Sequence, residues 1–589
     1  MRKRTIALLL AMTLVINLTA CAESATETST LDSAGNDNTE ISASTIKPTD
    51  NHFVDNDLLY ADDDDTSVIT MYLTVSKGTS SENTNHTWEE INSYSVYDYE
   101  EMGVERYAVS GLLQVGDENG PLEGELGYGK YSPNAVVTIR GQSSSLSPQK
   151  NYKIKLNENA GTWNDQQTIN LNKHVYEGLR FRNKLAYDLL EELPGMMALQ
   201  TQFVHLYVKD ETEGVNAAFV DYGLYTQVEQ PNKSFLQRHG LDKNGHLYKI
   251  NEFEFYRYED TIKLKNEIGY DITAFEERVE IKGDDDHSKL INMLDAVNDY
   301  SIAIDEVLEE WFDVDNLASW MAFHILLGNI DTQSRNVLLY SPLNVNKWYF
   351  ISWDNDGSLR RTEYRVQDKN KDGWSYGVSN YWGNVLFQRA LKSENFQSVL
   401  NQKIERFREI LTEEKMNDLV QSYANVVKPY VYSEADILYA PLTSAEYDVV
   451  CKGVIKEIEE NYQLYKKSLE QPMPFFIGVP ESTEEGLKFT WDVSYDFDNE
   501  NVFYSFELAD NFEFKNPIVL ETDIFVPGYT FEGELEPGQY FVRVKSRNES
   551  GEGQLAFDSY VSNAGDEVYS TRSFYVMQDG SIEVWVYGE

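Results

Sequence analysis

An aspartate and an asparagine five residues apart, followed by a second acidic cluster, are the side chains best suited to chemistry in this sequence. They lie in residues 329–336 (NIDTQSRN) and 353–356 (WDND). Protein kinases transfer phosphoryl groups with one Asp that orients the attacking hydroxyl, an Asn five residues later that binds metal, and a later Asp that holds the metal on the phosphates. The spacing gives these roles to Asp331, Asn336 and Asp354.

The surrounding sequence predicts elements that bring these residues together. Apolar residues recur at helical spacing before Gly328, and Asp313 or Asp315 offers a helix N-cap. Residues 337–340 and 348–351 read as two short buried strands joined by a turn. A hairpin places the residue before its first strand beside those after its second, so the acidic and amide groups should converge at one end.

A second interpretation remains open on spacing alone. Asn, Asp and Gly are turn residues, and Asp354 to Gly357 would form a good turn without any chemistry. If the site is real, Asp356 is a further metal ligand within the same turn.

A Gly- and Ser-rich loop lies between two predicted strands, 135–139 and 151–156. Its residues 140–145 read RGQSSS. Small residues let backbone N–H groups approach an anion, and a Lys or Arg neutralises it. We therefore expect Lys153 to bind phosphate, supported by Arg140, with Gly141, Ser143 and Ser144 forming the loop. The alternative is a surface hairpin with solvated lysines. No G-x-x-x-x-G-K-[ST] motif is present, which excludes a Walker-type NTPase.

Three segments in order resemble the CotH kinase family, a group of atypical protein-kinase-like enzymes. The first is R-G-Q-S-S-S with K-N-Y-K-I-K-L (140–156), and the second is Y-G-L-Y, V-E-Q and L-Y-K (222–249). The third combines N-x-D-x-x-x-x-N with W-D-x-D (329–356). The resemblance covers roughly residues 67–471. Gln142 replaces the usual Asn of the family, and Leu146 stands where an aromatic residue is common.

This resemblance implies an α+β fold: a two-lobed, atypical protein-kinase-like core. It also implies ATP and Mg²⁺ or Mn²⁺ as cofactors, and transfer of the γ-phosphate to Ser or Thr of a spore coat or cell-surface protein. It makes Glu229, which follows a predicted strand, a candidate for the nucleotide site. Two other functions remain open. A non-catalytic surface scaffold is favoured by the scarcity of ATP outside the membrane. A metal-dependent hydrolase lacks His ligands, because none of the eight His residues falls in the motif.

The N-terminus predicts export and a lipid anchor. In residues 1–21, a basic start and an apolar run precede Cys21, a pattern typical of a lipoprotein signal peptide. The alternative is a simple secretory signal in which Cys21 has no role. Residues 22–66 are polar and acidic and predict a flexible tether. The expected location is the extracytoplasmic face of the cell membrane, with Cys21 lipidated.

The charge of the chain limits its partners. The formal net charge is −48, from 50 Lys and Arg against 98 Asp and Glu. Phosphate backbones would be repelled, so nucleic-acid binding is disfavoured. An acidic kinase needs metal to screen ATP, which agrees with the proposed metal ligands.

The C-terminal part predicts a separate β module. Residues 383–471 are helical in pattern, and Pro472 and Pro474 break the chain. Short strands at regular spacing over residues 479–575 resemble a fibronectin type III β-sandwich, with a possible extra strand before 589. Such a module would contact polysaccharide or protein, or act as a spacer.

Overall fold

The computed structural model describes residues 53–60, 64–214, 217–369, 373–563, 565 and 567–584. The predicted signal peptide with Cys21 lies outside the described residues, as does almost all of the predicted tether. No helix within the described part is long and apolar enough to cross a membrane.

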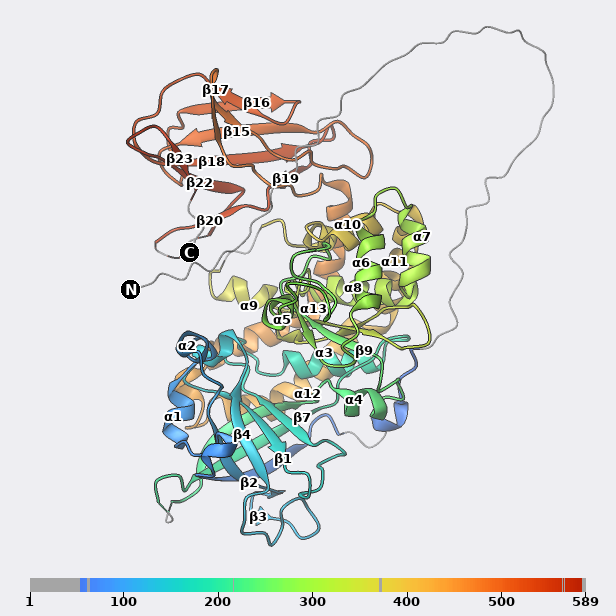
Figure 1. Ribbon diagram of the computed structural model, residues 1–589, viewed down its shortest axis with the longest axis vertical. Coiled ribbons are helices and arrows are strands. Elements are labelled where there is room, and N and C mark those ends of the chain that lie inside the picture. Colours follow the sequence, from blue (N-terminus) through green and yellow to red (C-terminus); the bar gives the residue numbers. More distant parts are fainter. Residues whose placement is uncertain are drawn as a thin grey trace, which may run out of the picture.

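A sheet that closes on itself forms the N-terminal part of the core (Figure 1). Within the described residues its strand order is β1-β7-β8-β6-β5-β4-β2-β3, and β1 also pairs with β2, which closes the ring. Strands β1 and β7 run parallel. The bounds are β1 Val68–Ser76, β2 Ala108–Asp117, β3 Gly120–Pro121, β4 Ala135–Arg140, β5 Asn151–Leu156, β6 Thr168–Asn172, β7 Thr201–Asp210 and β8 Val220–Val228.

The interior of this ring has its own apolar core. Alternate residues of each strand point inward, as the period of two requires. On β5, for example, Tyr152, Ile154 and Leu156 are buried, while Lys153 and Lys155 are exposed. The short helices α1 (Trp88–Ser93) and α2 (Val96–Met102) pack beside the ring, and both begin with a capping box.

A small sheet and several helices form the second part of the core. The sheet has the order β10-β9-β11-β12. Its strands are β9 His246–Ile250, β10 Val279–Ile281, β11 Val337–Ser341 and β12 Tyr349–Ser352. The helices are α3 Arg182–Glu191, α4 Lys233–Arg238, α5 Ile272–Arg278, α6 Ser288–Asn298, α7 Ile304–Trp311, α8 Val314–Leu327, α9 Arg361–Val366, α10 Val385–Leu391, α11 Glu394–Ile410, α12 Glu413–Val431 and α13 Ser444–Glu470.

Helix α8 and the β11–β12 hairpin have the predicted positions. Asp313 caps α8 through the N–H of Asn316, and Gly328 ends the helix in the left-handed conformation, with φ of 59°. In the hairpin, Val337 pairs with Ser352. The N–H of Trp353 donates to the carbonyl of Asn336 at 3.2 Å, so pairing continues one residue beyond the strands.

Among the described residues after α13, every helix or strand is a strand, and this β-region packs on the helical part (Figure 1). Its main antiparallel sheets have the orders β13-β14-β17 and β16-β15-β18-β22-β23, and they share one apolar cluster. The strands are β13 Glu481–Thr483, β14 Gly486–Phe489, β15 Phe503–Ala509, β16 Val519–Ile524, β17 Tyr529–Phe531, β18 Gly538–Arg547, β19 Gly553–Leu555, β20 Ser559–Val561, β21 Glu567–Tyr569, β22 Thr571–Val576 and β23 Ile582–Glu583. The predicted α+β core followed by an all-β region is confirmed.

Candidate active site

The loop after α8 carries Asp331 with a hydrogen-bond partner for each carboxylate oxygen. Asn336 Nδ2 donates to Asp331 Oδ2 at 2.9 Å, and Arg335 Nε lies 3.0 Å from Asp331 Oδ1. Burial raises the pKa of Asp331, while Arg335 opposes that rise. Asp331 and Asn336, five residues apart in sequence, are therefore direct neighbours.

The turn after β12 carries Asp354 and Asp356. Asp354 takes the left-handed conformation, with φ of 54°. Helix α3 holds this turn: the N–H of Asp354 donates to Tyr187 Oη at 3.1 Å, and the N–H of Asn355 donates to Asn183 Oδ1 at 2.9 Å. A left-handed non-glycine residue held by a neighbouring helix is a common feature of functional sites.

The two carboxylates of this turn repel each other. Burial raises the pKa of Asp354 to about 6, and the charge of Asp356 adds to the rise. His174, Arg140 and Lys249 act in the opposite direction. A bound cation would remove the repulsion, as expected for a metal-binding carboxylate pair.

The loop after α8 and the turn after β12 also meet each other. A Cβ added to Gly357 would lie 2.7 Å from Asn329 Oδ1 and 3.7 Å from the Cβ of Asp331. Asp356 also raises the pKa of Asp331 through its charge. The structure thus brings together the Asp331–Asn336 pair and the Asp354–Asp356 pair, which the sequence predicted to converge.

The donor set agrees with a kinase-type metal site. Within the described part of the chain, no group of three or more His, Cys, Asp or Glu side chains is arranged to hold an ion by itself. The Nδ2 of Asn336 is occupied by Asp331, so its carbonyl oxygen is the group left for an ion. Two carboxylates and an amide oxygen suit Mg²⁺ or Mn²⁺, provided that phosphate oxygens complete the coordination.

Four cations form a cluster beside this acidic turn: Arg140, Lys153, Lys249 and Lys282. Arg140 and Lys249 lie close enough to lower the pKa of Asp354. Although much of the Lys153 side chain is in contact with solvent, its partly desolvated amino group has a lowered pKa, and the charges of Lys282 and Arg140 lower it further. Glu280 pairs with Lys282, and its charge raises the pKa of Lys153 and Lys249, so it compensates part of the cluster. Four cations against this one carboxylate leave positive charge that phosphate groups would balance.

The Ser-rich loop closes over the end of β4 in a defined turn. Gly141 has φ of 87°, and a Cβ there would lie 2.1 Å from Ser144 Oγ, so the turn requires glycine. Ser144 Oγ accepts a hydrogen bond from Asn151 Nδ2 at 2.9 Å, and the carbonyl of Ser143 accepts one from Tyr176 Oη at 3.1 Å. Arg140, at the start of the loop, donates to Asn172 Oδ1.

A cleft of about 330 Å³ adjoins the cationic cluster. It lies between the strands of the ring, the segment after β8 and strand β10. Lys153 and Lys282 are part of its lining, and Gln166, Gln230 and Asn232 supply amide groups. The volume is that of a small-molecule pocket, and the lining combines lysine and amide side chains that can bind charged and polar groups.

Glu229 lines the same cleft, but its carboxylate is already engaged. Arg238 pairs with one oxygen, and His239 Nε2 lies 3.0 Å from the other. The N–H of Gln200 also donates to it, at 3.1 Å. This acid therefore holds α4 to the end of β8, and its charge is neutralised without a nucleotide.

Two residues near the acidic turn were not among the sequence-derived candidates. Lys249 occurs in the L-Y-K segment, but only its pairing opposite Leu338 on β11 shows that it approaches the site. His174 is buried, and its Nδ1 lies 3.7 Å from Asp356 Oδ2. Its left-handed backbone, with φ of 50°, has no sequence signal because nothing around it marks a turn.

Comparison with known proteins identifies the kind of chain. The sequence model described as CotH kinase protein matches residues 137–465, more than half of the 589 residues. The Helicobacter pylori proinflammatory kinase CtkA is similar at 10% identity and a TM-score of 0.26, over 54% of this chain and 94% of that one. A chain of the Shewanella oneidensis MR-1 toxin–antitoxin complex of HipA and HipB with operator DNA is similar at 12% identity and a TM-score of 0.22. That match covers 60% of this chain and 69% of the other. No curated protein matches the sequence.

Proposed function

Starting from the membership of this chain in the CotH kinase protein family, we propose that it transfers the γ-phosphate of ATP to Ser or Thr hydroxyls of a protein substrate. One observation supports the proposal most: Asn336, which donates to Asp331, pairs through its carbonyl with Trp353, the residue before Asp354, while the charges of Arg140 and Lys249 act on Asp354. An acid for the hydroxyl, ligands for a metal and cations for phosphates are the parts that this reaction needs.

The proposed mechanism assigns each of these groups one task. Asp331 accepts a hydrogen bond from the substrate hydroxyl, orients it and takes its proton as the new O–P bond forms. The bond between the γ-phosphorus and the oxygen that bridges it to the β-phosphate breaks, and ADP leaves. Asn336, Asp354 and Asp356 would hold Mg²⁺ or Mn²⁺, which neutralises charge on the phosphates when bound. The transition state is loose, so positioning and charge neutralisation supply most of the rate.

The cations and the cleft position the nucleotide. Arg140 and Lys249 contact the phosphates nearest Asp354, and Lys153 with Lys282 contacts those nearer the cleft. The base occupies the cleft between Gln166 and Gln230, whose amides offer donors and acceptors. Glu229 supports the wall of this cleft through Arg238.

The location and partners are also part of the proposal. An exported chain anchored through Cys21 would act on coat or cell-surface proteins. With a net charge of −48, the kinase would attract basic substrate segments at low ionic strength. The C-terminal β-region offers a further surface for protein or polysaccharide.

The test uses the purified chain and its Asp331→Ala variant. ATP with Mg²⁺ or Mn²⁺ should raise the melting temperature of both, because a ligand of the native state stabilises it by about 2.7 kcal/mol at a hundredfold excess over Kd. Transfer of labelled γ-phosphate to the chain itself or to a Ser/Thr-rich acceptor protein should occur only with the unchanged chain.

Asp418→Asn is the matched control, since Asp418 is an exposed acid on α12 far from these groups in sequence. It should behave as the unchanged chain in both assays. Equal transfer by Asp331→Ala would refute the assignment of Asp331. Absence of any metal-dependent stabilisation by ATP would favour the non-catalytic scaffold instead.

A further inference from the structure

The C-terminal β-region (described residues between 473 and 584) contacts a segment that supports the loop after α8. This loop (residues 329–336) is called the catalytic loop here, because the proposed function places Asp331 in it. The supporting segment, or bracing segment (residues 373–384), lies between α9 and α10, after the acidic turn in sequence. Trp382 stacks on Tyr495, with ring centroids 5.2 Å apart, and Trp374 Nε1 donates to the carbonyl of Phe557 at 3.3 Å. Gln554 Nε2 donates to Ser379 Oγ at 3.2 Å, where both side chains are buried.

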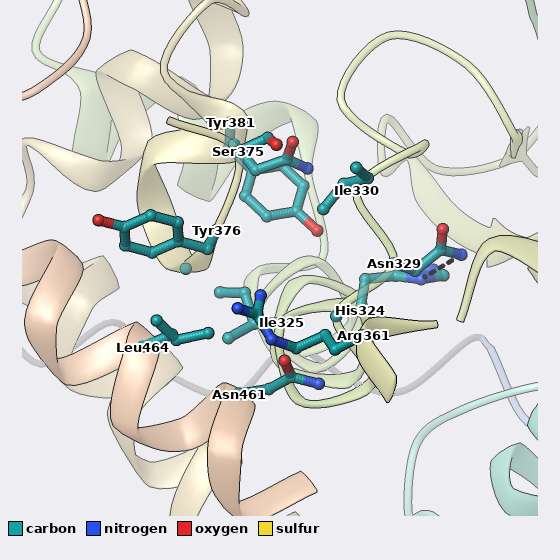
Figure 2. Close-up of a pocket in the computed structure, with 13 residues that line it drawn as sticks. His324, Ile325, Asn329, Ile330, Arg361, Ser375, Tyr376, Tyr381, Asn461 and Leu464 are labelled. Carbon is teal, nitrogen blue, oxygen red and sulfur yellow. Dashed lines mark hydrogen bonds between the residues drawn. The ribbon is translucent and has the colours of Figure 1, made fainter. Parts of the chain in front are cut away.

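The bracing segment in turn holds the catalytic loop by two hydrogen bonds. Tyr381 Oη lies 3.2 Å from Oγ1 of Thr332, the residue that follows Asp331. Asn384 Nδ2 donates to the carbonyl of Gln333 at 2.9 Å. Tyr381 also lines a small pocket, of about 20 Å³, together with Asn329 and Ile330 of the same loop (Figure 2).

The end of α13 locks this junction from a third side. Tyr376 Oη donates to Gln471 Oε1 at 2.6 Å, and Gln471 Nε2 donates to the carbonyl of Gly553 at 2.7 Å. The N–H of Val378 donates to Ser468 Oγ at 3.0 Å. The segment is therefore enclosed between α13 and the β18–β19 turn, and its position depends on both.

We propose that the C-terminal β-region is a positioning element for the catalytic loop, acting through the bracing segment. The expected effect on kcat rests on the proposed function. The expected ordering of residues 329–336 by the β-region does not. Asp331 is half exposed in a loop, and a loop needs outside contacts to hold a reactive group within the narrow geometry that catalysis requires. Tyr495 and Gln554 contact Trp382 and Ser379, which lie within two residues of Tyr381, the side chain that reaches Thr332 of the loop.

The last link of this chain of contacts is tested by two conservative variants. Asn384→Asp keeps the cap of α10, because the side-chain oxygen that accepts from the N–H of Leu386 remains, but removes the donor to Gln333. Tyr381→Phe keeps the buried ring and removes the hydroxyl near Thr332. Each should lower kcat by about 10- to 100-fold while KM for ATP stays within about twofold, because the cleft is untouched.

The link to the β-region is tested by Tyr495→Ala in the full chain. The matched control is Tyr529→Ala, which removes another partly buried tyrosine of the same region that packs on the internal cluster instead. Amide hydrogen exchange of residues 329–336 is measured in both. The proposal expects faster exchange there in Tyr495→Ala than in Tyr529→Ala, and unchanged exchange in β9 of both.

The outcomes separate the positioning role from the activity. Equal exchange of the loop in Tyr495→Ala and the unchanged chain would overturn the positioning role, whether or not the chain transfers phosphate. If the unchanged chain transfers no phosphate while Tyr495→Ala still loosens the loop, the proposed function fails and the positioning role stands. A rise in KM for ATP equal to the fall in kcat would also overturn the proposal.

Discussion

Two acids of the candidate site, Glu229 in the lining of the cleft and Asp354 in the turn after β12, have opposite charge environments. Glu229 is surrounded by Arg238, His239 and a backbone N–H, which compensate its charge within the protein. Asp354 faces the like charge of Asp356, and its pKa is raised to about 6. A compensated acid holds structure together, whereas an acid left beside another acid needs a cation from outside.

Among the variants that test this contrast, Asp354→Asn should have the largest effect, and the effect should be on activity. It removes one metal ligand and the charge opposite Arg140, so phosphotransfer should fall by about 10²- to 10³-fold. Stabilisation by ATP with metal should also be lost. Rates from labelled ATP and melting temperatures with and without metal measure both effects. Full metal-dependent stabilisation of the variant would show that Asp354 is as structural as Glu229.

Glu229→Gln should instead reduce the stability of the fold. The substitution leaves Arg238 with a neutral partner at a buried position. Loss of one charge of a buried pair lowers the free energy of unfolding by about 3 kcal/mol. Chemical denaturation measures the loss, with Glu484→Gln, at an exposed position, as the control. At a temperature where the variant remains folded, its kcat should stay close to that of the unchanged chain. A selective loss of ATP affinity with unchanged stability would place Glu229 in the nucleotide site.

The β11–β12 hairpin could be predicted from the sequence because its determinants are local. The apolar periodicity before Gly328, the cap at Asp313 and the two short strands fix where α8 and β11–β12 begin and end. A hairpin then brings its own ends together without information from elsewhere. The α+β core and the all-β region followed from similar local patterns and from the family resemblance.

What could not be predicted depends on contacts between distant segments. The closing of the sheet requires β1 to pair with β2 and also with β7, whose Phe203 lies opposite Val68 although the two are more than a hundred residues apart in sequence. The approach of Lys249 to Asp354 depends on pairing between β9 and β11. The compensation of Glu229 by His239 depends on how α4 packs, so sequence alone could not separate this acid from Asp354.

The smallest expected effect concerns the metal-free protein and its dependence on pH. The ordinary pKa of an Asp is near 3.8, and that of Asp354 in the fold is about 6. The folded state therefore keeps a proton that the unfolded state releases, and stability falls as pH rises between these values. Without metal, Asp354→Asn should match the unchanged chain below pH 4. It should melt about 2 °C higher above pH 6, because the repulsion with Asp356 is gone.

Metal provides the control for this pH effect. With ATP and Mg²⁺ bound, the cation compensates both carboxylates, so the advantage of Asp354→Asn at neutral pH should reverse. Melting curves from pH 4 to 8 measure both effects: the higher melting temperature of the variant without metal, and its reversal with ATP and metal. A variant that is less stable than the unchanged chain at neutral pH without metal would mean that Arg140 and Lys249 already compensate Asp354. The contrast with Glu229 would then disappear, because both acids would be structural.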